Sequence, residues 1–389
     1  MHKDQAHKDQ AHKDRAHKDR AHKDRAHRLN SKMEKNEDFL KWTKISEVFP
    51  NLSPGEKVRT LDHFKNSNDM DIREFNIFQP GDQGLGHSSI INPGSIKNED
   101  DTIDLLFRGE DTDASFSGYL MTDKASALKC TGTINNNNEI DFRKLKKFDN
   151  GMPAACRPED WRMFRHKDRV YSNFSNYYYL DRGWPQKTVR CSMGLSLILG
   201  KRMQFLRECD QSRIGLGESK LEKNWAFFSH NGKLKAVYCC EPWVIIEFDD
   251  SGNAISYERT NFKIKRLGNS YMACSTNPIE INIQSLGSVY LMFLHQYFYP
   301  NASLQGSRNR TYYQHALIIN KDTLKPIAWT PKPVLGGGIS TPGQFSGVLY
   351  TSSCITHGEY IYAFSGIGDS SSSYFRFKIE DLEKNLHTL

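Results

Sequence analysis

From about residue 85 to residue 379, short runs of β-branched and aromatic residues alternate with turns rich in Gly, Asn and Asp. Runs of this length and composition predict β-strands, and the turn residues between them predict tight connections. Helical periodicity is nearly absent from this part of the chain. We therefore expect a single all-β domain over residues 85–389.

One element recurs five times: one or two turn residues, then a strand of Val, Tyr, Leu or Phe that ends in a polar group. The copies contain Asp104, Val170, Leu234, Val289 and Tyr360, which lie 66, 64, 55 and 71 residues apart. A gap of this size holds about four short strands with their turns. Radial repetition protects the edges of such sheets, so we predict a five-bladed β-propeller. Two packed β-sandwich domains are the alternative, but no linker-like change in composition divides residues 85–385.

The N-terminal part has a different pattern. Residues 1–28 repeat the pentapeptide Ala-His-Lys-Asp followed by Gln or Arg, and a period of five presents no steady apolar face. We expect residues 1–30 to be a disordered, low-complexity tail. Apolar residues at helical spacing lie between Phe39 and Val48, before Pro50, and predict a short helix. This helix belongs to an extension, residues 31–84, that we expect to pack on the propeller.

Composition excludes several classes of protein. The net charge of +7 is modest and is not gathered into a basic stripe, so nucleic acid is not an expected partner. The longest apolar run, residues 195–199, is too short to cross a bilayer, and no stretch resembles a signal peptide. The eight cysteines are scattered without C-x-x-C spacing, which predicts free thiols. We therefore predict a cytoplasmic protein without a membrane span.

Polar side chains occur at corresponding strand ends of the five units. The set comprises Asn92 and Arg108 in the first unit, Glu159, Asp160 and Arg162 in the second, Lys223 and Glu241 in the third, His295, Arg308, Arg310 and Tyr312 in the fourth, and Asp369 in the last. Alone, Glu159, Asp160 and Arg162 would be an ordinary surface ion pair. In a propeller, however, the loops at one axial end converge, so we expect these residues to share one pocket.

The residue types in this set suggest sugar and phosphate chemistry. Carboxylates suit sugar hydroxyl pairs, Trp161 or Trp225 could stack on a sugar ring, and converging Arg and Lys side chains suit a phosphate. Glycosyl transfer needs an acid or base near the bridging oxygen. Asp160 is the one strongly placed acid, and several cations accompany it. This balance favours a phosphate as attacking or leaving group over water activated by a second carboxylate.

Five short motifs follow one another over roughly residues 85–380. They are Asn92-Pro93 with Leu105-Leu106-Phe107-Arg108; Glu159-Asp160-Trp161-Arg162; Glu222-Lys223-Asn224-Trp225-Ala226-Phe227-Phe228; His295 with Arg310-Thr311-Tyr312-Tyr313; and Tyr362-Ala363-Phe364-Ser365-Gly366-Ile367-Gly368-Asp369. Their order resembles that of the family 130 glycoside hydrolases and phosphorylases, five-bladed propellers that act on β-mannosides. It is also similar to that of the related family 108 glycosyltransferases, which make β-1,2-mannans.

The resemblance implies an inverting mannosyltransferase or mannoside phosphorylase that acts on β-1,2 linkages. Its partners would be mannose 1-phosphate or GDP-mannose, inorganic phosphate and a mannooligosaccharide acceptor, and no cofactor or metal is expected. Asp160 matches the family's general acid. The substrate-binding residues would be Asn92, Arg108, Glu159, Trp225 and Asp369, and the phosphate-binding residues Arg162, Lys223, Arg308, Arg310 and Tyr312.

Two departures from the family pattern leave alternatives open. Trp161 replaces the family's proline, and Cys240-Glu241-Pro242 stands where a phosphate-binding His-Arg-Pro is common. A carboxylate at Glu241 would repel phosphate and would fit a hydrolase, a nucleotide-sugar enzyme or a lapsed site. The alternatives are therefore a β-mannoside hydrolase, with Glu241 or Glu159 activating water, and a non-catalytic glycan-binding propeller.

Overall fold

The computed structural model describes residues 70–78, 89–110, 126–152, 157–179, 188–216, 222–264, 270–298, 311–336, 348–368 and 370–389. The predicted tail and the predicted helix, both within residues 1–50, lie outside these ranges, as does most of the extension over residues 31–84. The described part of that extension contains one strand, β1.

The described residues form five antiparallel sheets, numbered here in chain order. Sheet 1 contains β2 (Ser89–Lys97), β3 (Thr102–Glu110), β4 (Ser126–Ile134), β5 (Ile140–Phe142) and β6 (Lys146–Phe148). Sheet 2 contains β7 (Arg157–His166), β8 (Arg169–Tyr179), β9 (Thr188–Leu199) and β10 (Arg202–Glu208). Sheet 3 contains β11 (Ala226–His230), β12 (Lys233–Cys240), β13 (Trp243–Phe248) and β14 (Ala254–Thr260).

The last two sheets take strands from both ends of the described chain. Sheet 4 contains β15 (Ser270–Cys274), β16 (Ile279–Ile283), β17 (Gly287–Phe298), β18 (Thr311–Asn320), β19 (Pro326–Trp329), β20 (Leu335–Gly336) and β24 (His387–Thr388). Sheet 5 contains β21 (Leu349–His357), β22 (Tyr360–Ile367), β23 (Ser371–Lys378) and β1 (Arg73–Phe78). Because β1 pairs with β23, the N-terminal strand completes the C-terminal sheet. The helical elements are short: η3 (Ser212–Ile214) and α4 (Ile379–Lys384).

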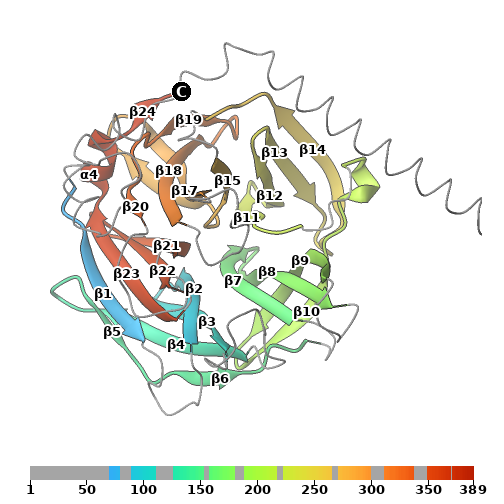
Figure 1. The fold of residues 1–389 in the computed structure, drawn as a ribbon, viewed down its shortest axis with the longest axis horizontal. Coiled ribbons are helices and arrows are strands. Elements are labelled where there is room, and N and C mark those ends of the chain that lie inside the picture. Colours follow the sequence, from blue (N-terminus) through green and yellow to red (C-terminus); the bar gives the residue numbers. More distant parts are fainter. Residues whose placement is uncertain are drawn as a thin grey trace, which may run out of the picture. The chain divides into compact units, whose positions relative to one another are not determined.

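The sheets are arranged around a common centre, with β2, β7, β11 and β21 near the middle and β1, β10 and β14 on the outside (Figure 1). The five repeats predicted from the sequence correspond to one strand in each sheet. Their marker residues lie in β3, β8, β12, β17 and β22, each of which pairs with the innermost strand of its sheet. The predicted repeat is therefore the second strand of each unit.

Hydrophobic side chains fill each junction between neighbouring sheets. Successive residues of a strand point to opposite faces, so one strand supplies two junctions. Leu106 of β3 packs in the cluster shared with sheet 2, whereas Phe107 packs in the cluster shared with sheet 5. Met292 and Phe293 of β17 divide in the same way between sheets 3 and 5. Burial on both faces explains why these strands read as continuous apolar runs.

The predicted all-β, propeller-like arrangement is confirmed, but the prediction of four strands in every sheet is not. Sheets 2, 3 and 5 have four strands, whereas sheet 1 has five and sheet 4 has seven. Most of the additional strands are short and share a neighbour with another strand, as β5 and β6 share β4, whereas β24 pairs with the free side of β19. In the described ranges no helix has the length and apolar character that a membrane span requires.

Gly94 of sheet 1 packs against the backbone of Trp161 in sheet 2. A Cβ atom on Gly94 would lie 2.1 Å from the carbonyl oxygen of Trp161. This oxygen is a backbone atom, so no change of side-chain rotamer can relieve the clash. We therefore expect Gly94→Ala to lower the free energy of unfolding by about 1–3 kcal/mol, as overpacking does. Urea unfolding of the variant and the wild-type chain measures this loss.

Ser95→Ala is the matched control for this substitution. The buried Ser95 hydroxyl has no hydrogen-bond partner among the described residues, so its removal should change stability little. Equal unfolding midpoints for Gly94→Ala and the wild type would contradict the packing of β2 on β7.

Candidate active site

Asp160 stands at a β-bulge on the innermost strand of sheet 2. The register between β7 and β8 shifts between Glu159 and Arg162, so Asp160 and Trp161 have no paired residue on β8. Asp160 has φ of 57°, a left-handed conformation that Asp and Asn tolerate better than other residues with a side chain. The bulge turns the Asp160 carboxylate out of the strand's regular alternation, and the side chain keeps 20% of its surface exposed.

A matching bulge on β2 supplies a partner for this carboxylate. The register with β3 shifts between Ile91 and Gly94, and Asn92 in this bulge has φ of 51°. The buried Asn92 amide donates from Nδ2 to Oδ1 of Asp160 at 2.6 Å. Two strands from different sheets therefore bring the predicted residues Asn92 and Asp160 into direct contact.

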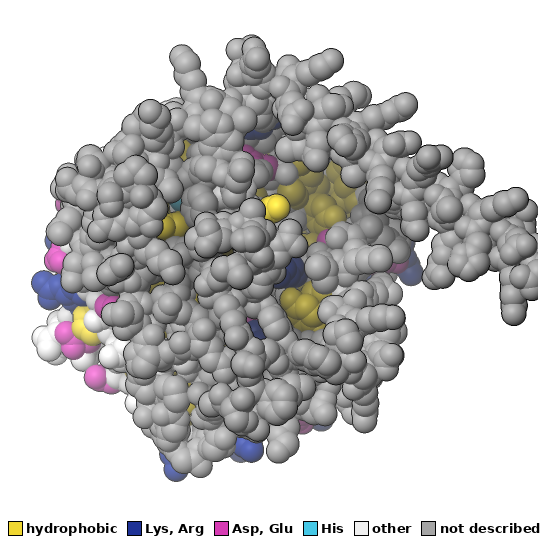
Figure 2. All heavy atoms as spheres, in the orientation of Figure 1, with side chains coloured by type: hydrophobic (Ala, Val, Ile, Leu, Met, Phe, Trp, Pro, Cys, Tyr) yellow, Lys and Arg dark blue, Asp and Glu magenta, His cyan; other side chains and the backbone are white. Residues whose placement is uncertain are grey.

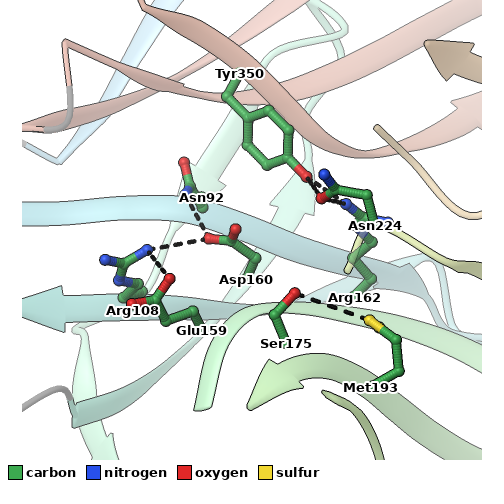
Figure 3. Close-up of polar contacts among 9 residues, drawn as sticks. All are labelled: Asn92, Arg108, Glu159, Asp160, Arg162, Ser175, Met193, Asn224 and Tyr350. Atoms are coloured by element: carbon green, nitrogen blue, oxygen red, sulfur yellow. Dashed lines mark hydrogen bonds and ion pairs between the residues drawn. The ribbon is translucent and has the colours of Figure 1, made fainter. Parts of the chain in front are cut away.

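Arg108 of β3 joins both adjacent carboxylates of β7 (Figure 3). Its Nη1 lies 3.2 Å from Oε2 of Glu159 and 3.4 Å from Oδ1 of Asp160. Arg108 and Glu159 are both buried, so their charges interact in surroundings of lower polarity than water. One guanidinium thus holds two neighbouring carboxylates that would otherwise repel each other.

The two carboxylate oxygens of Asp160 have different surroundings. Oδ1 accepts from Asn92 and Arg108, whereas Oδ2 has no hydrogen-bond partner among the residues that the structure describes. Hydrogen bonds at one oxygen fix the orientation of the group and leave the other oxygen able to exchange a proton with a bound molecule. This is the geometry required of a general acid or base.

Two further ionisable side chains, Tyr177 and Cys191, are affected by the charges of these carboxylates. Burial raises the pKa of the Tyr177 hydroxyl, and the negative charges of Glu159 and Asp160 raise it further. Burial also raises the pKa of the Cys191 thiol to about 12, and the positive charge of Lys223 opposes this increase. Lys223 itself is exposed. The predicted cation Lys223 therefore acts electrostatically on Cys191, a residue that the charges of Glu159 and Asp160 also affect.

Arg162 was predicted to bind phosphate, but the structure places its guanidinium against protein acceptors. Nη1 donates to the carbonyl oxygen of Trp225 at 3.1 Å, and Nη2 donates to Oδ1 of Asn224 at 3.0 Å. Nη2 also faces the carbonyl oxygen of Cys274 at 3.4 Å and the hydroxyl of Tyr350. With 2% of its surface exposed, Arg162 joins sheet 2 to sheets 3, 4 and 5 and serves as a structural tie.

Trp225 was predicted to line the substrate site, and this prediction also needs correction. The residue is 1% exposed and packs with Phe227, Tyr238 and Phe248 in the cluster between sheets 2 and 3. Its indole Nε1 donates to Oε2 of Glu222 at 3.2 Å. Trp161, the other candidate for stacking, is buried between sheets 1 and 2. Neither indole presents a face to a sugar.

The predicted residue Tyr312 lies in an aromatic group on sheet 4. Its ring stacks on His295 with a centroid distance of 5.4 Å, and the His295 ring meets the edge of Tyr350 at 5.2 Å. The Tyr350 hydroxyl in turn donates to Oδ1 of Asn224 at 3.1 Å and contacts the guanidinium of Arg162. Tyr312 is therefore connected through His295 and Tyr350 to Arg162, which lies on the same strand as Asp160.

A chain of hydrogen bonds determines which nitrogen of His295 carries its proton. Nε2 of Gln314 donates to the carbonyl oxygen of Leu349 at 2.7 Å, so Oε1 of Gln314 faces Ser275. The Ser275 hydroxyl must donate to that oxygen at 2.9 Å and can only accept from Nδ1 of His295, also at 2.9 Å. The proton of the neutral ring is therefore on Nδ1, and Nε2 carries the lone pair.

Glu241 lies after β12, and its carboxylate binds the protein backbone. Oε1 accepts a hydrogen bond from the backbone N–H of Ile264 at 2.5 Å. The remaining predicted residues, Arg308, Arg310 and Asp369, lie outside the described residues.

Sequence reasoning missed Tyr350 as part of this region, and it included Asn224 in the third motif without assigning it a role. Asn224 has φ of 64° immediately before β11, as Asn92 and Asp160 have in their own inner strands. An Asn or Asp next to an apolar strand is the only local signal for such a position, and it is weak because the same residues are common in turns. Tyr350 lies within the run Val348-Leu349-Tyr350, which carries no signal beyond a strand.

No family model and no curated protein matches the sequence, but solved structures have the same fold. The β-1,2-mannobiose phosphorylase from Listeria innocua is 13% identical, with a TM-score of 0.56 over 81% of this chain and 99% of that one. MPT-1, a GDP-Man-dependent mannosyltransferase from Leishmania mexicana, is 11% identical, with a TM-score of 0.50 over 76% of this chain and 86% of that one.

A third structure comes from work on the GH130 family of mannoside phosphorylases, which contains glycoside hydrolases that target β-1,2 mannosidic linkages in Candida mannan. It is 13% identical to this chain, with a TM-score of 0.50 over 85% of this chain and 95% of that one. These likenesses establish a shared fold. It is the fold of the group that the sequence motifs resemble.

If Arg162 joins the sheets and does not bind phosphate, its substitution should lower stability. Arg162→Met would remove the donor to the buried carbonyl oxygens of Trp225 and Cys274. We expect the free energy of unfolding to fall by about 3 kcal/mol or more, because buried acceptors would lose their partners. Arg165→Met, a partly buried arginine on the same strand, is the control and should unfold close to the wild type.

Urea unfolding and phosphate binding are measured on the same samples of these variants. Weaker phosphate binding by Arg162→Met with an unchanged unfolding midpoint would restore Arg162 as a phosphate ligand and contradict its role as a structural tie.

Proposed function

We propose that the chain catalyses inverting glycosyl transfer on β-mannosides, with β-1,2-linked mannooligosaccharides as acceptors. The donor is mannose 1-phosphate, for which the reverse reaction is phosphorolysis, or GDP-mannose. One observation carries the proposal: Asp160 is held at a single carboxylate oxygen by Asn92 and Arg108 at the convergent end of the sheets. The shared fold with a β-1,2-mannobiose phosphorylase and a GDP-Man-dependent mannosyltransferase supports the substrate class.

Asp160 moves the proton in either direction of this reaction. In phosphorolysis it donates a proton, directly or through a sugar hydroxyl, to the bridging oxygen as the glycosidic C–O bond breaks. A phosphate oxygen bonds to the anomeric carbon from the opposite face, which inverts its configuration. In synthesis the carboxylate accepts the proton of the acceptor hydroxyl as the new C–O bond forms and the phosphate group departs.

The remaining roles follow from the charges around Asp160. Asn92, Arg108 and Glu159 contact Asp160 or each other and would hold the mannosyl ring beside it, together with Asp369. The exposed Lys223 would attract the phosphate, with Tyr312, Arg308 and Arg310 completing that subsite. A cytoplasmic location stays a prediction from the sequence.

Hydrolysis ranks below transfer because it needs a second carboxylate that activates water. In inverting hydrolases the two carboxyl groups are about 6.5–9.5 Å apart, which leaves room for that water. Glu159 shares Arg108 with Asp160, and Glu241 accepts from the backbone of Ile264, so both candidates have protein donors. A purely glycan-binding protein would not need a carboxylate that is held at one oxygen, as Asp160 is by Asn92 and Arg108.

Asp160→Asn tests the catalytic assignment. Asn tolerates the left-handed conformation as well as Asp does, so the fold should persist. We expect the rate of mannooligosaccharide elongation to fall by about 10²- to 10⁴-fold, the usual contribution of a general acid–base group. Elongation is measured separately with mannose 1-phosphate and with GDP-mannose, and the unfolding midpoint is recorded for each variant.

Asp168→Asn is the matched control for this loss. Asp168 is an exposed aspartate with φ of 59° in the turn between β7 and β8. The substitution therefore makes the same chemical change as Asp160→Asn in a similar backbone conformation. Full activity in Asp160→Asn, or an equal loss in Asp168→Asn, would remove Asp160 from the mechanism.

Lys223→Ala tests the phosphate subsite. Hydrogen bonds to charged groups are worth about 1.5–3 kcal/mol, so the KM for inorganic phosphate should rise by about ten- to a hundredfold. Stability should not change, because Lys223 is exposed. Lys201→Ala, in the exposed turn between β9 and β10, is the control. If Lys223→Ala and Lys201→Ala give the same phosphate saturation curve, phosphate does not bind at Lys223.

A further inference from the structure

Three tyrosines form a row across three strands of sheet 4. Tyr271 of β15 lies directly opposite Tyr297 of β17, and Tyr297 lies directly opposite Tyr312 of β18. Side chains that are directly opposite on adjacent strands lie on the same face of a sheet. The register therefore brings the three rings together, and we call this set the tyrosine row.

The rings of the tyrosine row are stacked on one another. The centroids of Tyr271 and Tyr297 are 5.3 Å apart with an interplanar angle of 19°, and those of Tyr297 and Tyr312 are 5.5 Å apart at 24°. Tyr271 keeps 56% of its surface exposed. An exposed ring backed by two others is already ordered, so a ligand that covers it loses little conformational entropy.

The tyrosine row is continuous with the residues around Asp160. Tyr297 and Tyr312 both stack on His295, whose ring lies 5.2 Å from that of Tyr350. Tyr350 contacts Arg162, two residues after Asp160. Figure 3 shows Tyr350 across from Asp160, and Figure 2 shows hydrophobic and basic side chains near the middle of the same view as Figure 1.

We propose that Tyr271, which is backed by the rest of the tyrosine row, is a stacking platform for a mannosyl unit of the acceptor, beyond the unit that reacts at Asp160. One face of a pyranose carries C–H groups with a partial positive charge, which are attracted to the negative face of an aromatic ring. The structure thereby offers at Tyr271 the aromatic surface that the buried Trp161 and Trp225 cannot provide. This proposal rests on the proposed function and extends it to the acceptor's length.

Acceptors of two lengths test the platform. With one donor, kcat/KM is measured for mannose and for β-1,2-mannotetraose in the full-length wild type, Tyr271→Ala and Tyr271→Phe. An aromatic contact is worth about 0.5–1.5 kcal/mol, so Tyr271→Ala should lower the value for mannotetraose by about three- to tenfold. The value for mannose should not change, and Tyr271→Phe should keep that for mannotetraose because the ring remains.

Tyr257 provides a matched control at a distance from the site. It is 41% exposed on β14, the outermost strand of sheet 3, so Tyr257→Ala should affect neither acceptor. As a direct readout, Tyr271→Trp should change its fluorescence when mannotetraose is added, whereas Tyr257→Trp should not. Equal effects of Tyr271→Ala on both acceptors, or none on either, would overturn the platform.

The fluorescence experiment also separates this proposal from the proposed function. If the wild type elongates mannotetraose but Tyr271→Trp gives no response, the platform is wrong and the transferase proposal stands. If no acceptor is elongated from either donor but Tyr271→Trp responds to mannotetraose, the platform stands as a binding site and transfer is wrong. No response and no elongation would overturn both.

Discussion

A single buried guanidinium joins four of the five sheets at their common centre. Arg162 of sheet 2 donates to backbone and side-chain acceptors of Asn224 and Trp225 in the segment leading into sheet 3, and contacts Cys274 of sheet 4 and Tyr350 of sheet 5. The inner strands end in polar backbone groups that cannot reach one another by regular pairing, and an arginine supplies several donors in one planar group. The rest of the central region depends on this tie.

The same strand that carries the tie also carries the reactive carboxylate. The bulge between Glu159 and Arg162 lets Arg162 point into the centre while Asp160 turns toward sheet 1. There Asn92, on its own bulge, and Arg108 hold one oxygen of the carboxylate. The residue that joins the sheets and the proposed catalytic carboxylate therefore lie on one short segment. A substitution at Arg162 should affect Asp160 by moving its carboxylate and not by removing a charge beside it.

The sequence predicted the repeated units well because their second strands are buried on both faces and read as continuous apolar runs. It also placed Asn92, Arg108, Glu159 and Asp160 in one group, because these residues recur at corresponding strand ends, and the structure brings the four side chains into contact. It misplaced Arg162 and Trp225. A bulge shifts the alternation of side chains by one residue, and no local pattern in the sequence shows where that shift occurs. The register of the tyrosine row is a long-range property of the same kind.

Phosphorus and proton NMR of the wild-type chain with β-1,2-mannobiose and inorganic phosphate test the central claim most directly. If Asp160 serves a phosphorolytic site, the phosphate signal should decrease as an α-configured mannose 1-phosphate signal and one equivalent of mannose appear. Release of mannose at the same rate with and without phosphate would show hydrolysis instead. Unchanged mannobiose, with no elongation from mannose 1-phosphate or GDP-mannose, would contradict glycosyl transfer altogether.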